Sequence, residues 1–193
     1  MSFVISVKSD LKKLSSQFQS FSKSIHPKVI ARTLNRVAAS VKAASAKYIA
    51  PKMNCTQRDA KRRIAEDRAF ANKLWASIIP SGRPLKLIAF KARQSAKGVV
   101  AKAWGKSKLY KRSFIAPVKH GSSTNAVYVR KGNHSLPVKQ LWGAGVVQLF
   151  KQKENLELMV ATVKRRFSVE LVHNMRFYLN NRIRNRDNSV GSA

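Results

Sequence analysis

The chain has 193 residues, of which 44% are hydrophobic, and it carries 39 Lys and Arg against 8 Asp and Glu, for a formal net charge of +31. This length and apolar content predict one folded domain, or one domain with arms, and argue against a disordered chain. Cys55 is the only cysteine, so an intramolecular disulfide and a thiolate metal cluster are excluded. No window is apolar enough to cross a membrane and the start lacks the apolar core of a signal peptide, so we expect a soluble protein made in a reducing compartment.

The acidic residues are few and unevenly placed. No carboxylate side chain lies between Arg68 and Lys153, since the acids are Asp10, Asp59, Glu66, Asp67, Glu154, Glu157, Glu170 and Asp187. Solubility alone needs a net charge of magnitude only about 2–8 in a small domain. The excess here therefore indicates association with a polyanion or with acidic proteins.

The first part of the chain is expected to be helical. Helical spacing within residues 1–25 predicts an N-terminal arm with a short amphipathic helix. Residues 27–50 form the clearest helix, because Pro27 suits a first turn and Pro51 ends the run. One apolar stripe runs along this helix and is expected to pack in the core; it consists of Ile30, Leu34, Val37, Val41, Ala44 and Tyr48.

A second, strongly basic helix is expected over residues 56–69. Thr56 is a suitable N-cap, and Asp59 stands three positions later, as in a short-armed capping box. The basic side chains, Arg62 and Arg63 among them, fit a solvated face, a phosphate contact or a protein interface. The sequence does not rank these three roles.

The hydrophobic period changes to two between residues 73 and 130, which indicates short antiparallel strands joined by basic, polar loops. We expect about four or five strands, taken from the apolar runs at 74–79, 85–92, 97–104, 113–118 and 126–130. The basic stretch 105–112 is expected to be either a long mobile hairpin tip or a disordered surface loop.

Helical spacing returns over residues 153–184, with one face formed by Leu156, Val160, Val163, Phe167, Leu171, Met175 and Tyr178. The predicted fold class is therefore α+β, with a small antiparallel sheet over about 74–130, N-terminal helices and a long C-terminal helix. We expect one domain over residues 26–183 and a flexible basic tail at 184–193.

Signatures of catalysis are not found in the sequence. None of the 4 histidines has metal-ligand spacing, no phosphate-binding glycine loop is present, and Cys55 has no local signature of a nucleophile. We therefore expect no enzyme and no cofactor, although a histidine-based nuclease using His120 or His134 remains conceivable. The tryptophans lie in apolar runs and are expected to be core or interface residues: Trp75, Trp104 and Trp142.

Three motifs follow one another in order: "LNRVA" in the first helix, "FKARQSAKGVVAKAWG" across the expected strands and "RKGNHSLPVKQLWG" before the last helix. In their order and spacing, over residues 27–180, the chain resembles the minor tail protein Z family of tailed bacteriophages and prophages. The resemblance implies a structural, non-enzymatic virion protein of the head–tail joint, a tail completion or neck protein made in the host cytoplasm. It also implies a homo-oligomeric ring of about six copies at the top of the tail, in contact with the tail terminator, the tail tube and the head connector or adaptor around the DNA channel.

The third motif, residues 130–143, combines a turn with apolar side chains, and we call it the knuckle. Pro137 fixes one backbone angle, and Gly143 allows a tight turn. The knuckle either anchors a neighbouring subunit, with Trp142 as a hot spot, or packs on its own sheet and turns the chain toward the last helix. The residues assigned to the interface are Arg130, Leu136, Pro137, Val138, Leu141, Trp142 and Gly143.

The basic excess has two explanations. It lines a channel and makes non-specific contact with genomic DNA, or it faces acidic neighbours in the tail. The candidates for either contact are Arg62, Arg63, Lys106, Lys108, Lys111 and Arg112. The alternative function is a free, non-specific nucleic-acid-binding protein, for which binding would fall steeply with salt.

Overall fold

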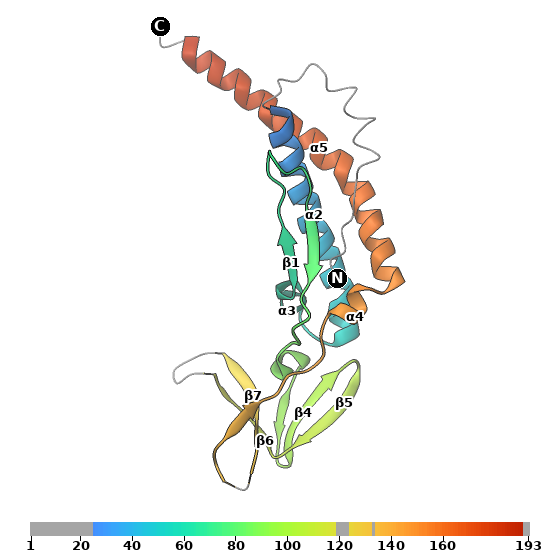
Figure 1. Cartoon of the computed structure of the whole chain (residues 1–193), viewed down its shortest axis with the longest axis vertical. Helices are drawn as coiled ribbons and strands as arrows, with labels where there is room; N and C mark the ends of the chain where they lie inside the picture. Colours follow the sequence, from blue (N-terminus) through green and yellow to red (C-terminus); the bar gives the residue numbers. More distant parts are fainter. Residues whose placement is uncertain (1–24, 119–123, 133, 191–193) are drawn as a thin grey trace. The chain divides into compact units, whose positions relative to one another are not determined.

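The computed structural model describes residues 25–118, 124–132 and 134–190. Its helices and small antiparallel sheets confirm the predicted α+β class (Figure 1). The expected arm lies outside the described residues up to Ser24, and so does His120.

The chain divides into two compact units, each with its own core. Unit 1 contains residues 1–44, 66–79 and 157–193, and unit 2 contains residues 45–65 and 80–156. The predicted single domain over 26–183 stays a prediction, because a division by contacts does not establish that either unit folds independently.

Unit 1 takes its core from two helices, α2 (Ile25–Met53) and α5 (Lys153–Val190). The predicted stripe on α2 is confirmed in this unit, since Ile30, Leu34, Val37 and Val41 are buried. Two polar contacts join the helices: Arg36 Nη1 lies 3.2 Å from Glu170 Oε2, and the Asn174 amide donates to Thr33 Oγ1 at 3.1 Å.

The end of α2 differs from the prediction. Pro51 lies inside the helix, which continues to Met53, because the fully buried Met53 fixes the last turn in the core of unit 2. The buried face also shifts to Ser45, Ile49 and Met53 here, which releases Tyr48 from the predicted stripe to make polar contacts.

The stripe predicted on α5 is partly wrong. Val163, Phe167 and Leu171 are buried as expected, but Val160 is 44% exposed and its neighbour Met159 is buried instead. The buried Asn155 amide donates to the Phe150 carbonyl at 2.9 Å, which turns this side of α5 inward. Met159, four residues later, lies on the same side and is therefore buried in place of Val160. The helix also continues past residue 184, the predicted start of the basic tail, as far as Val190.

The basic helix is shorter than predicted. Helix α3 spans Gln57–Arg62, and Thr56 is its N-cap, with Thr56 Oγ1 accepting the Asp59 N–H at 3.1 Å. The following residues form strand β1 (Ile64–Asp67), which pairs with β2 (Ser77–Pro80), because burial of Ile64 overrides the helical pattern.

Two three-stranded antiparallel sheets belong to unit 2. The first has the order β3-β4-β5 and the second β6-β7-β8. Their bounds are Arg93–Ser95 (β3), Gly98–Ala103 (β4), Lys106–Lys111 (β5), Ser113–Pro117 (β6), Asn125–Arg130 (β7) and Val138–Gln140 (β8).

Two segments of unit 2 were predicted wrongly. Residues 105–112 are not a loop: β5 pairs with β4 along its whole length, and the hairpin turns at Trp104 and Gly105, both with positive φ. The run 85–92 is not a strand but contains the 3₁₀ helix η2 (Leu87–Phe90), because Leu87 and Phe90, three residues apart, both enter the core. Helix α4 (Val147–Phe150) then leads into α5.

Candidate functional site

The first half of the knuckle is an exposed loop between β7 and β8. The Lys131 N–H donates to the Pro137 carbonyl at 3.1 Å and closes the loop. The Arg112 guanidinium donates to the Gly132 carbonyl at 2.6 Å and fixes the loop to the end of β5. Leu136 is 70% exposed in this loop. A backbone restrained by these two hydrogen bonds therefore presents a large apolar side chain to solvent.

The backbone of the second half of the knuckle is hydrogen-bonded to residues 85–87 of the same unit. The Gly143 N–H donates to the Leu85 carbonyl at 2.8 Å, and the Leu87 N–H donates to the Leu141 carbonyl at 3.2 Å. Lys86 and Trp142 form a backbone bridge between these bonds, yet the Trp142 side chain stays 45% exposed. The backbone of this segment is therefore held by hydrogen bonds within unit 2, while nearly half of the Trp142 side chain is accessible to a partner.

Gly143 is needed for space rather than for a turn. A Cβ at this position would lie 2.2 Å from Cε2 of Phe90, a fully buried ring, and Gly143 has no left-handed φ. Two further interface candidates face each other in the second sheet, since Val138 in β8 pairs with Arg130 in β7. The assignment of the knuckle to an interface stays a prediction.

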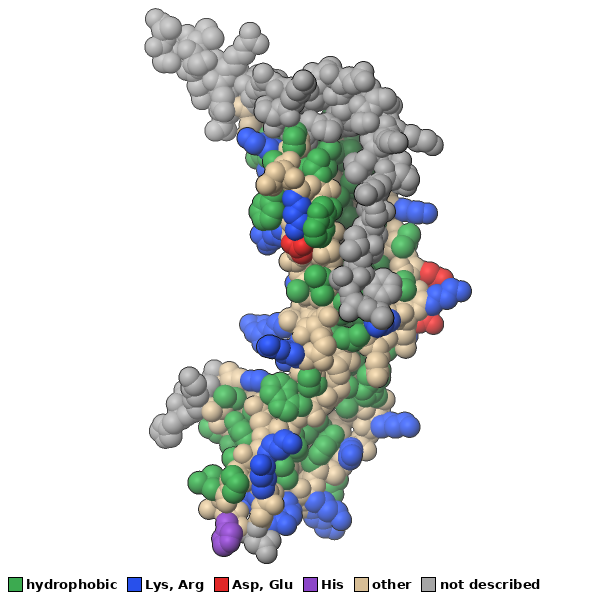
Figure 2. All heavy atoms as spheres, in the orientation of Figure 1, with side chains coloured by type: hydrophobic (Ala, Val, Ile, Leu, Met, Phe, Trp, Pro, Cys, Tyr) green, Lys and Arg blue, Asp and Glu red, His purple; other side chains and the backbone are tan. Residues whose placement is uncertain are grey.

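The basic candidates occupy two different elements. Arg62 ends α3 and Arg63 is its C-cap, whereas Lys106, Lys108 and Lys111 lie on β5, set apart from α3 in Figure 1. All three lysines are exposed. Figure 2 shows Lys and Arg side chains over the sheets of unit 2 with no acidic side chain among them, as the acid-free stretch requires.

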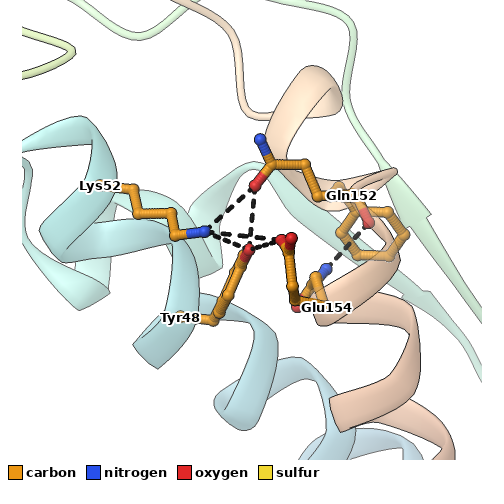
Figure 3. Close-up of polar contacts among 6 residues, drawn as sticks. Tyr48, Lys52, Gln152 and Glu154 are labelled. Carbon is orange, nitrogen blue, oxygen red and sulfur yellow. Dashed lines mark hydrogen bonds and ion pairs between the residues drawn. The ribbon is translucent and has the colours of Figure 1, made fainter.

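A polar cluster that the sequence did not reveal joins α2 to the start of α5 (Figure 3). The Tyr48 hydroxyl lies 2.6 Å from Glu154 Oε2 and 2.9 Å from Gln152 Oε1, and Lys52 donates to Tyr48. The hydrogen bond from Tyr48, and then the charge of Lys52, lowers the pKa of Glu154. The hydrogen bond with Tyr48 likewise raises the pKa of Lys52. These contacts join the C-terminal part of α2 to the start of α5 at the surface of unit 2.

Comparison with models of protein families matches the chain to "Prophage minor tail protein Z (GPZ)" over residues 10–185. The chain belongs to this family. Comparison with curated proteins and with solved structures gives no match. The resemblance inferred from the three motifs is therefore confirmed, and the chain is a structural protein of the bacteriophage tail.

Cys55 is buried, and burial raises the pKa of its thiol, so little thiolate is available at neutral pH. Among the described residues, no group of three or more His, Cys, Asp and Glu side chains is placed to hold a metal ion. No helix in the same residues is long and apolar enough to span a bilayer.

The tryptophans of the tail protein are less buried than a core role requires. Trp75, Trp104 and Trp142 are 47%, 37% and 45% exposed. Of the two roles expected for them, core or interface, this exposure argues against the core, and the interface role stays a prediction. Trp104 also has a positive φ, which is unusual for a bulky residue and is imposed by the two-residue turn between β4 and β5.

Proposed function

We propose that this tail protein is a tail completion or neck protein, which forms a ring of about six copies at the top of the tail. The ring would connect the tail terminator and tail tube to the head connector or adaptor around the DNA channel. The observation that carries the proposal is family membership over residues 10–185. It is supported by the exposure of Leu136 and Trp142, which a tied backbone presents from unit 2.

The role we propose is mechanical and not enzymatic. The knuckle would contact a neighbouring subunit through its two exposed apolar side chains, since large side chains on a rigid support lose little freedom on binding. The cations of α3 and β5 would face either DNA or acidic tail proteins. A diffuse field of exposed lysines suits DNA that must slide, because it attracts phosphates without fixing a register.

Copy number in separated heads and tails tests the ring. Quantitative mass spectrometry of purified virions should find about six copies that travel with the tail. About twelve copies travelling with the head would instead place the protein in the connector. If neither fraction contained the protein, the structural role at the joint would be wrong.

A free nucleic-acid-binding protein is the second candidate, favoured by the acid-free stretch between Arg68 and Lys153. It predicts binding of duplex DNA by the isolated chain, with an affinity that falls steeply with salt. Replacing Lys106, Lys108 and Lys111 with Gln should reduce the salt slope by about one per lost phosphate contact. Unchanged genome retention and ejection by phage carrying these substitutions would exclude DNA as the partner of β5.

A further inference from the structure

Unit 1 contains a groove that takes no part in the contacts proposed above. One wall is the part of α2 from Lys28 to Ala39, and the other consists of Glu66 in β1 and residues 68–71 that follow it. Glu66 is itself paired with Lys42 at 3.2 Å. Tyr178 of α5 closes one side. The knuckle and β5 belong to unit 2 and contribute no residue to this groove.

Four cations line the groove, and only one of them has an ion pair with a described carboxylate. Lys28, Arg32 and Arg36 recur every four residues and so share one face of α2, and Arg68 stands on the opposite wall. Arg36 is paired with Glu170 at 3.2 Å. Within the described residues, no ion pair joins Lys28, Arg32 or Arg68 to a carboxylate. Arg32 is held in place by the ring of Phe177, 4.2 Å from its guanidinium carbon.

The second wall is held firmly in place. Asn35 donates to the Ala69 carbonyl at 2.9 Å and accepts the Ala69 N–H at 2.8 Å, so one side chain binds both polar groups of a buried residue. Phe70 and Lys73 exchange two backbone hydrogen bonds of 2.9 Å. These bonds fix a segment that leaves Phe70 58% exposed beside the arginines. An ordered backbone that displays a large apolar ring is typical of a contact surface.

The chain itself offers no spare anion to fill the groove. Every carboxylate whose side chain the structure describes already has an interaction: Asp59 with Thr56, Glu66 with Lys42, Asp67 with Lys73, Glu170 with Arg36, and Glu154 and Glu157 at the start of α5. Asp187, near the end of α5, stands among Arg182, Arg184 and Arg186 in the sequence. Residues 1–24 contain only one acid, Asp10, among several lysines. An occupant must therefore bring its own negative charge, which disfavours a second copy of this chain.

We propose that the groove binds an acidic segment of a different tail protein. Its carboxylates would pair with Arg32 and Arg68, whose planar guanidinium groups suit bidentate contacts. An apolar side chain of the same segment would cover Phe70 and the alanines of the groove, Ala31, Ala39 and Ala71. A phosphodiester backbone has no such apolar group, so these surfaces favour protein over DNA. This inference rests on the membership of the chain in a family of tail proteins. It does not require that the protein forms a ring.

Photo-cross-linking in assembled virions tests this assignment. Benzoylphenylalanine replaces Phe70 in the full chain, and in a matched control it replaces Leu158, a 38% exposed residue of the same unit that does not line the groove. The Phe70 position should cross-link to a peptide of another tail protein with Asp or Glu within about four residues of the linked site. The Leu158 position should not give this product.

Charge variants provide the second arm of the test. Arg32→Gln with Arg68→Gln should lower the cross-link yield about tenfold. Arg165→Gln with Arg166→Gln removes the same charge from exposed positions of α5 outside the groove and should change the yield less than about twofold. If the first double variant fails to fold, Arg68→Gln alone tests the point, because Arg68 is exposed. Equal losses in both double variants would show that only net charge matters and would overturn the proposal.

The remaining outcomes are also decisive. A cross-link from Phe70 to DNA, to residues 1–24 or to another copy of this chain would each overturn the assignment. So would the absence of a protein cross-link in tails that contain the chain, and this result would leave the ring untouched. A cross-link to an acidic segment in tails with a copy number far from six would refute the ring and support the groove.

Discussion

The contact between Gly143 and Phe90 shows how one atom constrains the knuckle. A Cβ at residue 143 would meet the Phe90 ring at 2.2, 2.8 and 3.0 Å, and this ring is fully buried. We expect Gly143→Ala to destabilise the protein by about 1–3 kcal/mol, because a packed core cannot accept the extra atom without moving. Urea-induced unfolding measures the change in free energy.

The matched control for this prediction is Gly82→Ala. A Cβ there meets no atom within 4 Å, and the backbone is not left-handed. We expect a change of less than about 0.5 kcal/mol. Equal effects at the two positions would mean that contact with Phe90 is not the cause.

Tyr48 is the main cause of the lowered pKa of Glu154 in the surface cluster. In Tyr48→Phe the pKa of Glu154 should rise toward its ordinary value, because the strongest cause of its lowering, the tyrosine hydrogen bond, is lost. A carboxyl with a lowered pKa in the folded state contributes stability above its unfolded pKa and loses it as the pH falls through the folded pKa. The stability difference between the two proteins should therefore disappear in acid.

A ¹³C NMR titration of the Glu154 carboxyl measures this pKa directly. The charge of Lys52 remains in the variant, so part of the lowering should persist. Tyr110→Phe is the control, since this ring lies against Lys108 and has no recorded contact with Glu154. A Glu154 pKa that is unchanged in Tyr48→Phe would contradict the assignment.

At the scale of the elements, the turn between β4 and β5 sets the position of the basic strand. Gly105 has a φ of +72° and no atom within 4 Å of a Cβ position. We expect Gly105→Ala to cost about 1–2 kcal/mol through the backbone alone, since L-residues disfavour this conformation. The free energy of unfolding measured in urea checks the value.

Gly132→Ala is the matched control for the turn. It also has open space around the Cβ position, but its φ is not left-handed. Its effect should stay below about 0.5 kcal/mol. A similar loss in both variants would show that backbone strain at Gly105 is not responsible.

The sequence predicted those elements that have one buried and one exposed face. Helix α2 and strands β4, β6 and β7 were found by their apolar spacing. Strand β5 was missed because almost every residue of Lys106–Lys111 is exposed, so an edge strand of this kind has no apolar alternation to detect. Strand β1 was hidden because "IAED" fits the end of a basic helix equally well.

The candidate sites were predictable only where they are local in sequence. The knuckle is one continuous motif, so its exposed Leu136 and Trp142 could be proposed in advance. The groove of unit 1 combines α2, residues 68–71 and Tyr178 of α5, which no spacing rule brings together. Asn35 gave no signal of its role either, because its partner is a backbone group 34 positions away.

At the scale of the whole molecule, Trp142 is expected to act in assembly rather than in folding. Trp142→Ala should lower the free energy of unfolding by only about 1–2 kcal/mol, because the indole is 45% exposed and its bridge to Lys86 uses only backbone atoms. If the indole is a hot spot, completed tails should fall at least about tenfold, as a loss of about 2 kcal/mol or more implies. Infectious titre per particle and electron microscopy of tails measure this effect.

Trp75→Ala is the matched control, since Trp75 is 47% exposed and belongs to unit 1. Its removal tests whether any exposed indole matters for assembly. Normal assembly with a folded Trp142→Ala protein would exclude the knuckle from the interface.

The absence of carboxylates between Arg68 and Lys153 has a chemical consequence for mapping neighbours. Carbodiimides couple a lysine amine directly to a carboxylate with no spacer atoms. Any such coupling product at Lys106, Lys108 or Lys111 must take its acid from outside this stretch. The sheets of unit 2 thus supply amines but no carboxylates for the coupling reaction. Each isopeptide bond formed at one of their lysines therefore identifies a carboxylate of another segment or of a neighbouring protein.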